Sequence, residues 1–142
     1  MPLGKQKGVS MEINYWAVIV AALSGFAVGA LWYGPLLGKQ WMAASGVTEA
    51  DVKNTNFPKI YGVTFLMSLL SAYVLAHVVA QFDATTAKAG AQAGAWLWLG
   101  FIITVQVTDA LFNRGSMRLV SIDAGYRLIW LVVMGVILAV WR

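Results

Sequence analysis

The sequence of 142 residues has no cysteine and a single histidine, His77. Without cysteine there is no thiol nucleophile, no thiolate metal site and no residue that would report on a redox compartment. One histidine also excludes a haem held by two histidines of this chain and a metal cage built from several histidines. We therefore expect no metal, no cofactor and no catalytic residue.

Charge is scarce as well. Charged residues make up 11% of the chain and hydrophobic residues 60%, whereas soluble domains contain about 25% and about 45–50%. The mean hydropathy is +0.72. This composition excludes a soluble globular domain, a disordered chain and a nucleic-acid binder. The net charge is +4, but the basic residues stand mostly between apolar runs, as in membrane proteins. The sequence thus predicts an integral membrane protein whose partner is the lipid bilayer.

Four apolar runs are long enough to cross a bilayer, which takes about 20 helical residues. Backbone groups in lipid must be bonded within a helix or a closed barrel, and these runs lack the alternation of strands. We expect an all-α fold, a four-helix transmembrane bundle with antiparallel neighbours. No internal repeat is evident. The bundle is a single domain over residues 11–142, with helices at about 13–37, 60–82, 91–112 and 124–141.

Two segments lie outside these runs. Residues 1–10 are polar, and we interpret them as a tail outside the fold: a native extension, a mis-assigned start or a cloning remnant. The loop over residues 39–59 is the only long connection. Thr48 and Asp51 have the spacing of a capping box there, which predicts a short interfacial helix that begins at Thr48 and ends before residue 54.

Small side chains recur at helical spacing in every run, which is typical of helices that pack closely in lipid. The positions are Gly25 and Gly29 in the first run, Ser68, Ala72, Ala76 and Ala80 in the second, Gly100 in the third, and Gly135 in the fourth. The main interpretation is packing of the four helices within one chain. In the alternative, the Gly25/Gly29 pair mediates a homo-oligomer.

Ionisable residues inside a membrane segment cost about 2.5–3.5 kcal/mol near the bilayer centre, and they suggest function. Asp109 lies near the end of the third run and Arg127 near the start of the fourth. Both are therefore at similar depth, at the end of the bundle that carries the loop 39–59. We call this the long-loop end, and we predict an Asp109–Arg127 ion pair there. His77 lies towards the opposite end, and we expect its ring to be hydrogen-bonded.

The long-loop end gathers aromatic, polar and charged side chains, and Gly34-Pro35 should bend or end the first helix there. In the plainer interpretation, the aromatic rings form an interfacial belt, Asp109 neutralises Arg127, and other arginines meet lipid phosphates. In the functional interpretation, a polar pocket binds a small polar molecule or a lipid headgroup. The candidate binding residues are Trp32, Tyr33, Lys39, Trp41, Gln106, Asp109, Asn113, Arg114 and Arg127.

Basic residues are more frequent at the long-loop end than at the opposite end, which favours a cytoplasmic long loop and both termini outside. The long-loop end carries Lys39, Lys53, Lys59, Arg114 and Arg118, and the opposite end Lys88 and Arg142.

Four short segments are distinctive together. They are Met11-Glu12-Ile13-Asn14-Tyr15, Gly29-Ala30-Leu31-Trp32-Tyr33-Gly34-Pro35-Leu36, Gly38-Lys39-Gln40-Trp41-Met42 and Thr108-Asp109-Ala110-Leu111-Phe112. They resemble the DUF1761 family of small bacterial membrane proteins, and the resemblance extends over residues 11–142. It implies a four-helix protein of uncharacterised function in the bacterial cytoplasmic membrane, and it offers no catalytic residue to carry over.

Three functions stay open. The chain is either a structural or accessory subunit, working as a homo-oligomer or within a larger membrane complex; a small-solute or proton-coupled transporter with an ionisable site at Asp109 and Arg127; or a membrane enzyme acting on a lipid or apolar substrate. Small-residue faces and scarce buried charge favour the first. Small multidrug exporters carry an acid in the middle of helix one, which is absent here.

Overall fold

The computed structural model describes residues 12–142, so the tail at residues 1–10 lies outside the described residues. The described chain is helical and contains no strand, as predicted. Its elements are α1 (Tyr15–Leu31), the π-helical turn η1 (Trp32–Leu36), α2 (Gly38–Ser45), α3 (Glu49–Lys53), α4 (Phe57–Gln81), α5 (Ala87–Leu97), the π-helical turn η2 (Trp98–Ile102), α6 (Ile103–Phe112) and α7 (Met117–Val140).

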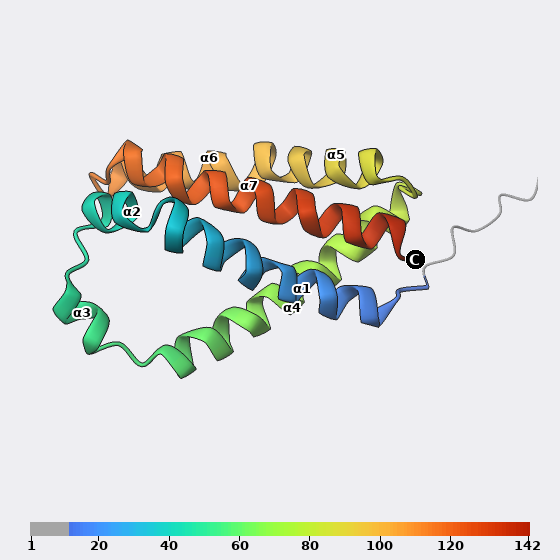
Figure 1. The fold of residues 1–142 in the computed structure, drawn as a ribbon. Helices are drawn as coiled ribbons and strands as arrows, with labels where there is room; N and C mark the ends of the chain where they lie inside the picture. The colour runs from blue at the N-terminus through green and yellow to red at the C-terminus, as the bar shows by residue number, and fades with distance from the viewer. Residues whose placement is uncertain (1–11) are drawn as a thin grey trace, which may run out of the picture.

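Four segments are long and apolar enough to cross a membrane, in agreement with the predicted transmembrane bundle. They are Tyr15–Leu36, Phe57–Gln81, Ala87–Phe112 and Met117–Val140, and we call them spans one to four. Consecutive spans run antiparallel, and α2, α3, the start of α4 and the end of α6 lie together at the left of Figure 1. That side is the long-loop end, and spans one and three both run towards it.

Each span begins at a residue whose side chain caps the helix. Asn14, Asn56, Thr86 and Ser116 accept hydrogen bonds from backbone N–H groups two or three residues later, which satisfies donors that have no partner within the helix. Span four consequently begins at Met117, earlier than the predicted start near residue 124. A prediction from hydropathy places the boundary of a span at the charged residue that borders the apolar run. A capped helix, in contrast, continues through polar residues beyond that run.

The first loop contains two helices. The predicted capping box is present: the Thr48 backbone N–H donates to Asp51 Oδ2 at 2.9 Å, and the Asp51 N–H donates to Thr48 Oγ1 at 3.2 Å. The hydrogen bond from the Thr48 backbone favours the ionised carboxylate and lowers the pKa of Asp51. Helix α2 lies in a stretch for which the sequence predicts a loop. It ends at Gly46, whose φ of 74° is a conformation that suits glycine.

Spans one and three each contain a π-helical turn. In η1, Gly34 leaves helical geometry (φ −99°, ψ −106°) directly before Pro35, so the predicted bend is confirmed. The turn η2 in span three was not predicted. A π turn inserts one residue into a helix, which rotates all following side chains by about 100° around the axis.

The core lies where α7 contacts α1, α4 and α5. Its largest fully buried side chains are Leu75, Val79 and Met134, and the predicted stripe of small residues from Ser68 to Ala80 in α4 is buried too. The closest approach joins α5 to α7, where a Cβ added at Gly90 would overlap the carbonyl oxygen of Gly135, and one added at Gly135 would overlap that of Gly90. Small residues thus allow backbone contact between the helices.

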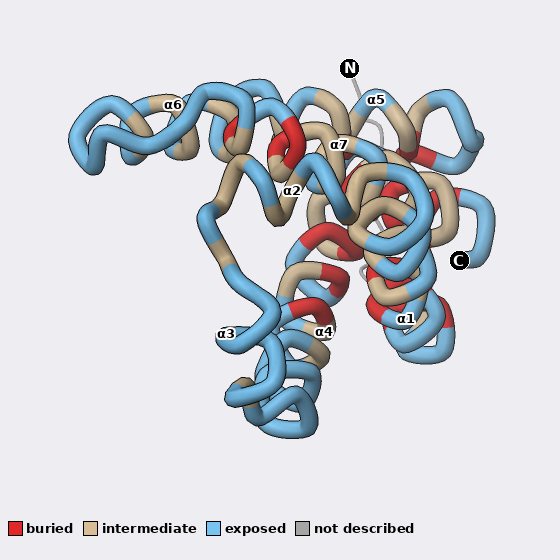
Figure 2. Tube along the Cα trace, turned by 60° about the vertical axis from the view of Figure 1, so that its left-hand side comes forward, coloured by how far each residue is buried: buried red, intermediate tan, exposed pale blue. Residues whose placement is uncertain are grey.

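Two parts of the bundle remain unpacked. Towards its N-terminus α4 diverges from the other spans, and its residues from Phe57 to Met67 are exposed except for half-buried Phe65. Figure 2 shows this half of α4, together with α3, almost entirely as exposed, and α6 as a mixture of exposed and half-buried residues. The second half of span three is the other unpacked part: its first half packs against α7 and buries Gly90 and Gly94, whereas no residue of α6 is buried. None of the most apolar 18-residue window of span three is buried, compared with 28%, 33% and 39% in spans one, two and four.

Candidate functional site

Aromatic side chains from η1, α2 and α7 meet at the long-loop end. The ring of Tyr33 lies edge-on to Trp41 and Tyr126, with centroid distances of 5.9 Å and 5.2 Å. Tyr126 stacks on Trp130 at 6.4 Å. We call these four residues and Trp32 the aromatic cluster. Aromatic pairs at such distances are worth about 0.5–1.5 kcal/mol each beyond burial of their area, so the cluster ties span one to span four.

One carboxylate belongs to this cluster. The Tyr33 hydroxyl donates a 2.6 Å hydrogen bond to Asp123 Oδ1, and both residues are half-buried. A hydrogen bond to a charged group contributes about 1.5–3 kcal/mol, more than one between neutral groups. Asp123 stands in the second turn of α7, so the bond fixes the start of span four against the end of span one.

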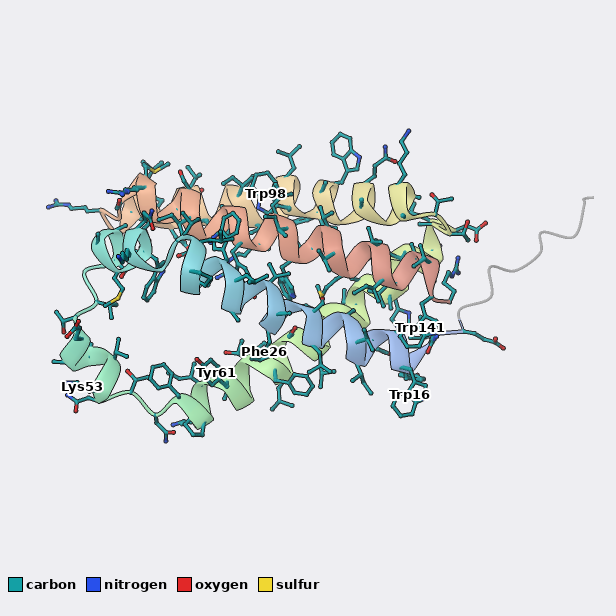
Figure 3. All side chains as sticks on the ribbon, in the orientation of Figure 1. Trp16, Phe26, Lys53, Tyr61, Trp98 and Trp141 are labelled. Atoms are coloured by element: carbon teal, nitrogen blue, oxygen red, sulfur yellow. The ribbon has the colours of Figure 1, made fainter. Side chains whose placement is uncertain are left out.

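Two tryptophans hold α7 from both sides. The indole N–H of Trp32 donates to the carbonyl of Ile122 at 2.9 Å, and that of Trp98 donates to the carbonyl of Ala124 at 2.8 Å. Each is the first residue of a π turn. Figure 3 shows Trp98 between α5 and α7. The turns share the residues Leu-Trp-x-Gly, at positions 31–34 and 97–100, so a local repeat that the sequence analysis did not detect becomes evident in the structure.

The predicted Gly25/Gly29 pair is filled within the chain. A Cβ added at Gly25 would overlap the indole of Trp130, and one added at Gly29 would contact the ring of Tyr126 at 3.4 Å. The Tyr126 hydroxyl also donates to the carbonyl of Gly25 at 3.0 Å. Two aromatic side chains of α7 therefore pack on this face of α1. The face is not free to contact a second chain, as a homo-oligomer mediated by the Gly25/Gly29 pair would require.

The chain matches the family described as "Protein of unknown function (DUF1761)" over residues 16–139. It belongs to the DUF1761 family. No curated protein and no solved structure matches it. The matched residues of this DUF1761 chain include all four spans except the first residue of span one and the last of span four.

The predicted ion pair in the DUF1761 chain does not form. Within residues 12–142 the only salt bridge joins Arg142 to Asp83 at 3.2 Å, at the opposite end. Asp109 and Arg127 are both exposed. Their depth along the spans was inferred from residue counts, but the side of the helix was not, and η2 rotates the part of span three that carries Asp109. Asp123 takes the position in the cluster that Asp109 was expected to occupy.

The other predicted binding residues separate into two groups. Trp32, Tyr33 and Trp41 belong to the aromatic cluster, where they are half-buried. Gln106 is half-buried, and its Oε1 has no hydrogen-bond partner among the described residues. The remaining predicted residues are exposed, and within residues 12–142 their side chains make no hydrogen bond: Lys39, Asp109, Asn113, Arg114 and Arg127.

The opposite end of the DUF1761 fold is held by simpler contacts. The Asn14 amide donates to the carbonyl of Trp141 at 3.5 Å, and Arg142 pairs with Asp83. The His77 ring lies edge-on to Tyr73 at 4.6 Å, and among the described residues it has no hydrogen bond of the kind predicted. The Asn14 and Arg142 contacts join the ends of spans one, two and four, whereas the His77–Tyr73 contact lies within α4.

Asp123 is absent from the predicted site because hydropathy alone assigns residues 113–123 to a loop. A signal was present: Ser116 followed by a helical continuation places Asp123 and Arg127 one turn apart on span four. Recognising Ser116 as a cap would have brought Asp123 into the helix and next to the end of span one.

Proposed function

We propose that this DUF1761 protein works as a helix-packing subunit of a membrane assembly, and that the exposed side of span three is where another membrane helix docks. The observation that supports the proposal is the unequal burial of the four spans. Spans one, two and four bury a quarter or more of their most apolar window, and span three buries none of it.

The exposed side of span three is suited to helix contact. Gly100 has open space around the position of a Cβ. The hydroxyls of Thr104 and Thr108 are bonded to the carbonyls of Gly100 and Thr104 on their own helix, at 2.9 Å and 2.8 Å. Their methyl groups and the bare glycine therefore present a smooth surface, the kind on which helices approach closely in lipid.

Asp109 gives this side a polar element. It is exposed, it lies within span three, and within the described residues its side chain has no hydrogen bond or ion pair. A carboxylate that faces lipid is costly unless it reaches water or a partner. A partner helix that supplies a donor or a cation at this depth would offset the cost.

The charge distribution supports an orientation for the assembly. Five basic residues stand at the long-loop end, on α2, α3, the start of α4, the turn after α6 and the start of α7: Lys39, Lys53, Lys59, Arg114 and Arg118. The opposite end has Lys88 and Arg142, and the latter is paired with Asp83. We infer that the long loop faces the cytoplasm and that the protein resides in a bacterial cytoplasmic membrane.

Native mass spectrometry of the protein, extracted gently from its own membrane, tests the proposal. We expect a stoichiometric complex for the wild type and for Ala27→Leu, which enlarges an exposed residue on span one. Gly100→Leu should lose the complex although its new side chain has space within the chain. A wild type that is monomeric with lipid alone, or a Gly100→Leu variant that assembles fully, would contradict the proposal.

A further inference from the structure

We propose that the partner is a second copy of this chain: the outward side of α4 in each copy packs against the outward side of α6 in the other, and Lys59 of one copy pairs with Asp109 of the other. This inference rests on the proposed function and names its partner. It describes an isologous dimer, in which the same two surfaces are used twice about a two-fold axis.

The outward side of α4 is apolar and has no partner helix in its own chain. Val63, Met67 and Leu70 are 51%, 54% and 56% exposed. They stand at spacings of four and three residues, so they share one side of the helix. A continuous apolar side of this length suits a helix–helix contact.

The other side of α4 packs against α1. This contact keeps the outward side of α4 facing away from its own chain. Phe26 of α1 contacts Tyr61 and Phe65, with ring centroids 6.3 Å and 6.0 Å away, and Figure 3 shows Phe26 and Tyr61 facing each other between the two helices. The Ser68 hydroxyl donates to the carbonyl of Ala22 at 3.0 Å. Turning α4 towards its own α6 would break these contacts, so a second chain is the better source of the missing neighbour.

The start of α4 and the end of α6 lie at the same end of the bundle. Span two begins and span three ends at the long-loop end (Figure 1). Lys59 is the third residue of α4, and Asp109 is the fourth from the end of α6. With a rise of about 1.5 Å per residue, each charge lies within about 5 Å of the end of its own helix.

The two charges are complementary and both are available. Within residues 12–142 neither Lys59 nor Asp109 forms a salt bridge, and both are exposed. The long lysine side chain can bend along the helix to reach a carboxylate at similar depth. In a two-fold dimer the pair forms twice, and each formation relieves the cost of leaving Asp109 towards lipid.

The repeated π turn points to the same arrangement. Spans one and three each bind α7 through the tryptophan that begins the Leu-Trp-x-Gly segment. Span one has α4 as a further neighbour, whereas span three contacts α4 only slightly. In the dimer, α4 of the second copy supplies span three with the neighbour that span one already has.

Charge reversal tests the pairing. We expect Asp109→Lys and Lys59→Asp each to raise the dissociation constant of the dimer in lipid bilayers at least tenfold, and the double variant to return to within threefold of wild type. Lys88→Asp, an exposed reversal at the opposite end, should change nothing. Single reversals without effect, or a double variant that does not recover, would overturn the pairing.

Disulfide cross-linking provides a test that does not alter charge, because the chain has no cysteine of its own. Val63→Cys and Val105→Cys chains, expressed together, should form a disulfide-linked dimer, whereas neither should form one alone. If one chain that carries both cysteines forms only an internal disulfide, α4 closes on its own α6 and the inference is wrong.

Native mass spectrometry separates the two proposals: a stoichiometric foreign subunit without a second copy rejects only this inference, and a monomer rejects both.

Discussion

The contact between α5 and α7 predicts a loss of stability whose magnitude can be worked out from the backbone geometry. In Gly135→Ala, the new methyl group would overlap the Gly90 carbonyl oxygen and lie 3.0 Å from its carbonyl carbon. Backbone atoms cannot turn aside as a flexible side chain can, so the two helices must separate. Overpacking of this kind costs about 1–3 kcal/mol, and the higher helix propensity of alanine offsets about 1 kcal/mol. We expect a net loss of up to about 2 kcal/mol in the free energy of unfolding.

Gly62→Ala is the matched control. Gly62 lies inside α4 and has open space at the Cβ position, so the same substitution should leave stability unchanged or raise it by up to about 1 kcal/mol. Unfolding by titration with sodium dodecyl sulfate, followed by circular dichroism, measures both variants. If Gly135→Ala unfolds at the same detergent fraction as Gly62→Ala, the helices do not touch as the structure shows.

The contact also predicts coupling. Gly90 and Gly135 meet at one point, and a methyl group on either should separate the same pair of helices. The separation caused by the first substitution makes room for the second. The double variant should therefore lose less stability than the sum of the two single losses, as neighbours that share a contact do. Strict additivity would show that each alanine acts on something other than this crossing.

Two further predictions concern side-chain hydrogen bonds. Tyr33→Phe should lose about 1.5–3 kcal/mol of stability, because Asp123 loses its donor. Tyr73→Phe is the control, and a loss that is unchanged when Asp123→Ala has already removed the acceptor would contradict the bond. At the capping box, the lowered pKa of Asp51 means that its stabilisation of α3 is fully present above the ordinary aspartate value of about 3.9 and is lost as the pH falls through the lower folded value. Amide exchange in α3 should accelerate in that acid range for the wild type and not for Asp51→Asn, and equal pH dependence of the two would refute it.

Much of the fold follows from local sequence. The four apolar runs predict the spans because crossing a bilayer sets a minimum length and requires helical hydrogen bonding. Thr48 and Asp51 predict the short helix of the first loop because a capping box involves only residues three apart. The caps also explain the errors: Ser116 starts span four seven residues before the boundary near residue 124 that hydropathy suggests, because hydropathy does not register a capped helical turn outside the apolar run.

The candidate site was predictable in its place along the chain but not in its composition. Trp32, Tyr33 and Trp41 were assigned to the long-loop end, and they meet there. The acid was misassigned: Asp109 has the predicted depth but is exposed, and Asp123 is bonded to Tyr33. The depth of a residue in the bundle follows from counting residues along the helix. The direction in which its side chain points depends on the rotation of the helix about its axis, and each π turn earlier in the span changes that rotation.

The four apolar helices, their alternating direction and the residues at each end of the bundle are encoded locally. These properties depend on residue type and on distance along the chain. Which sides of the helices meet depends instead on how the four spans pack. The π turn at Trp98 rotates α6, the α7 aromatics fill Gly25 and Gly29, and α4 leans away from span three. Each of these outcomes depends on side-chain packing between segments far apart in the sequence, which no local pattern encodes.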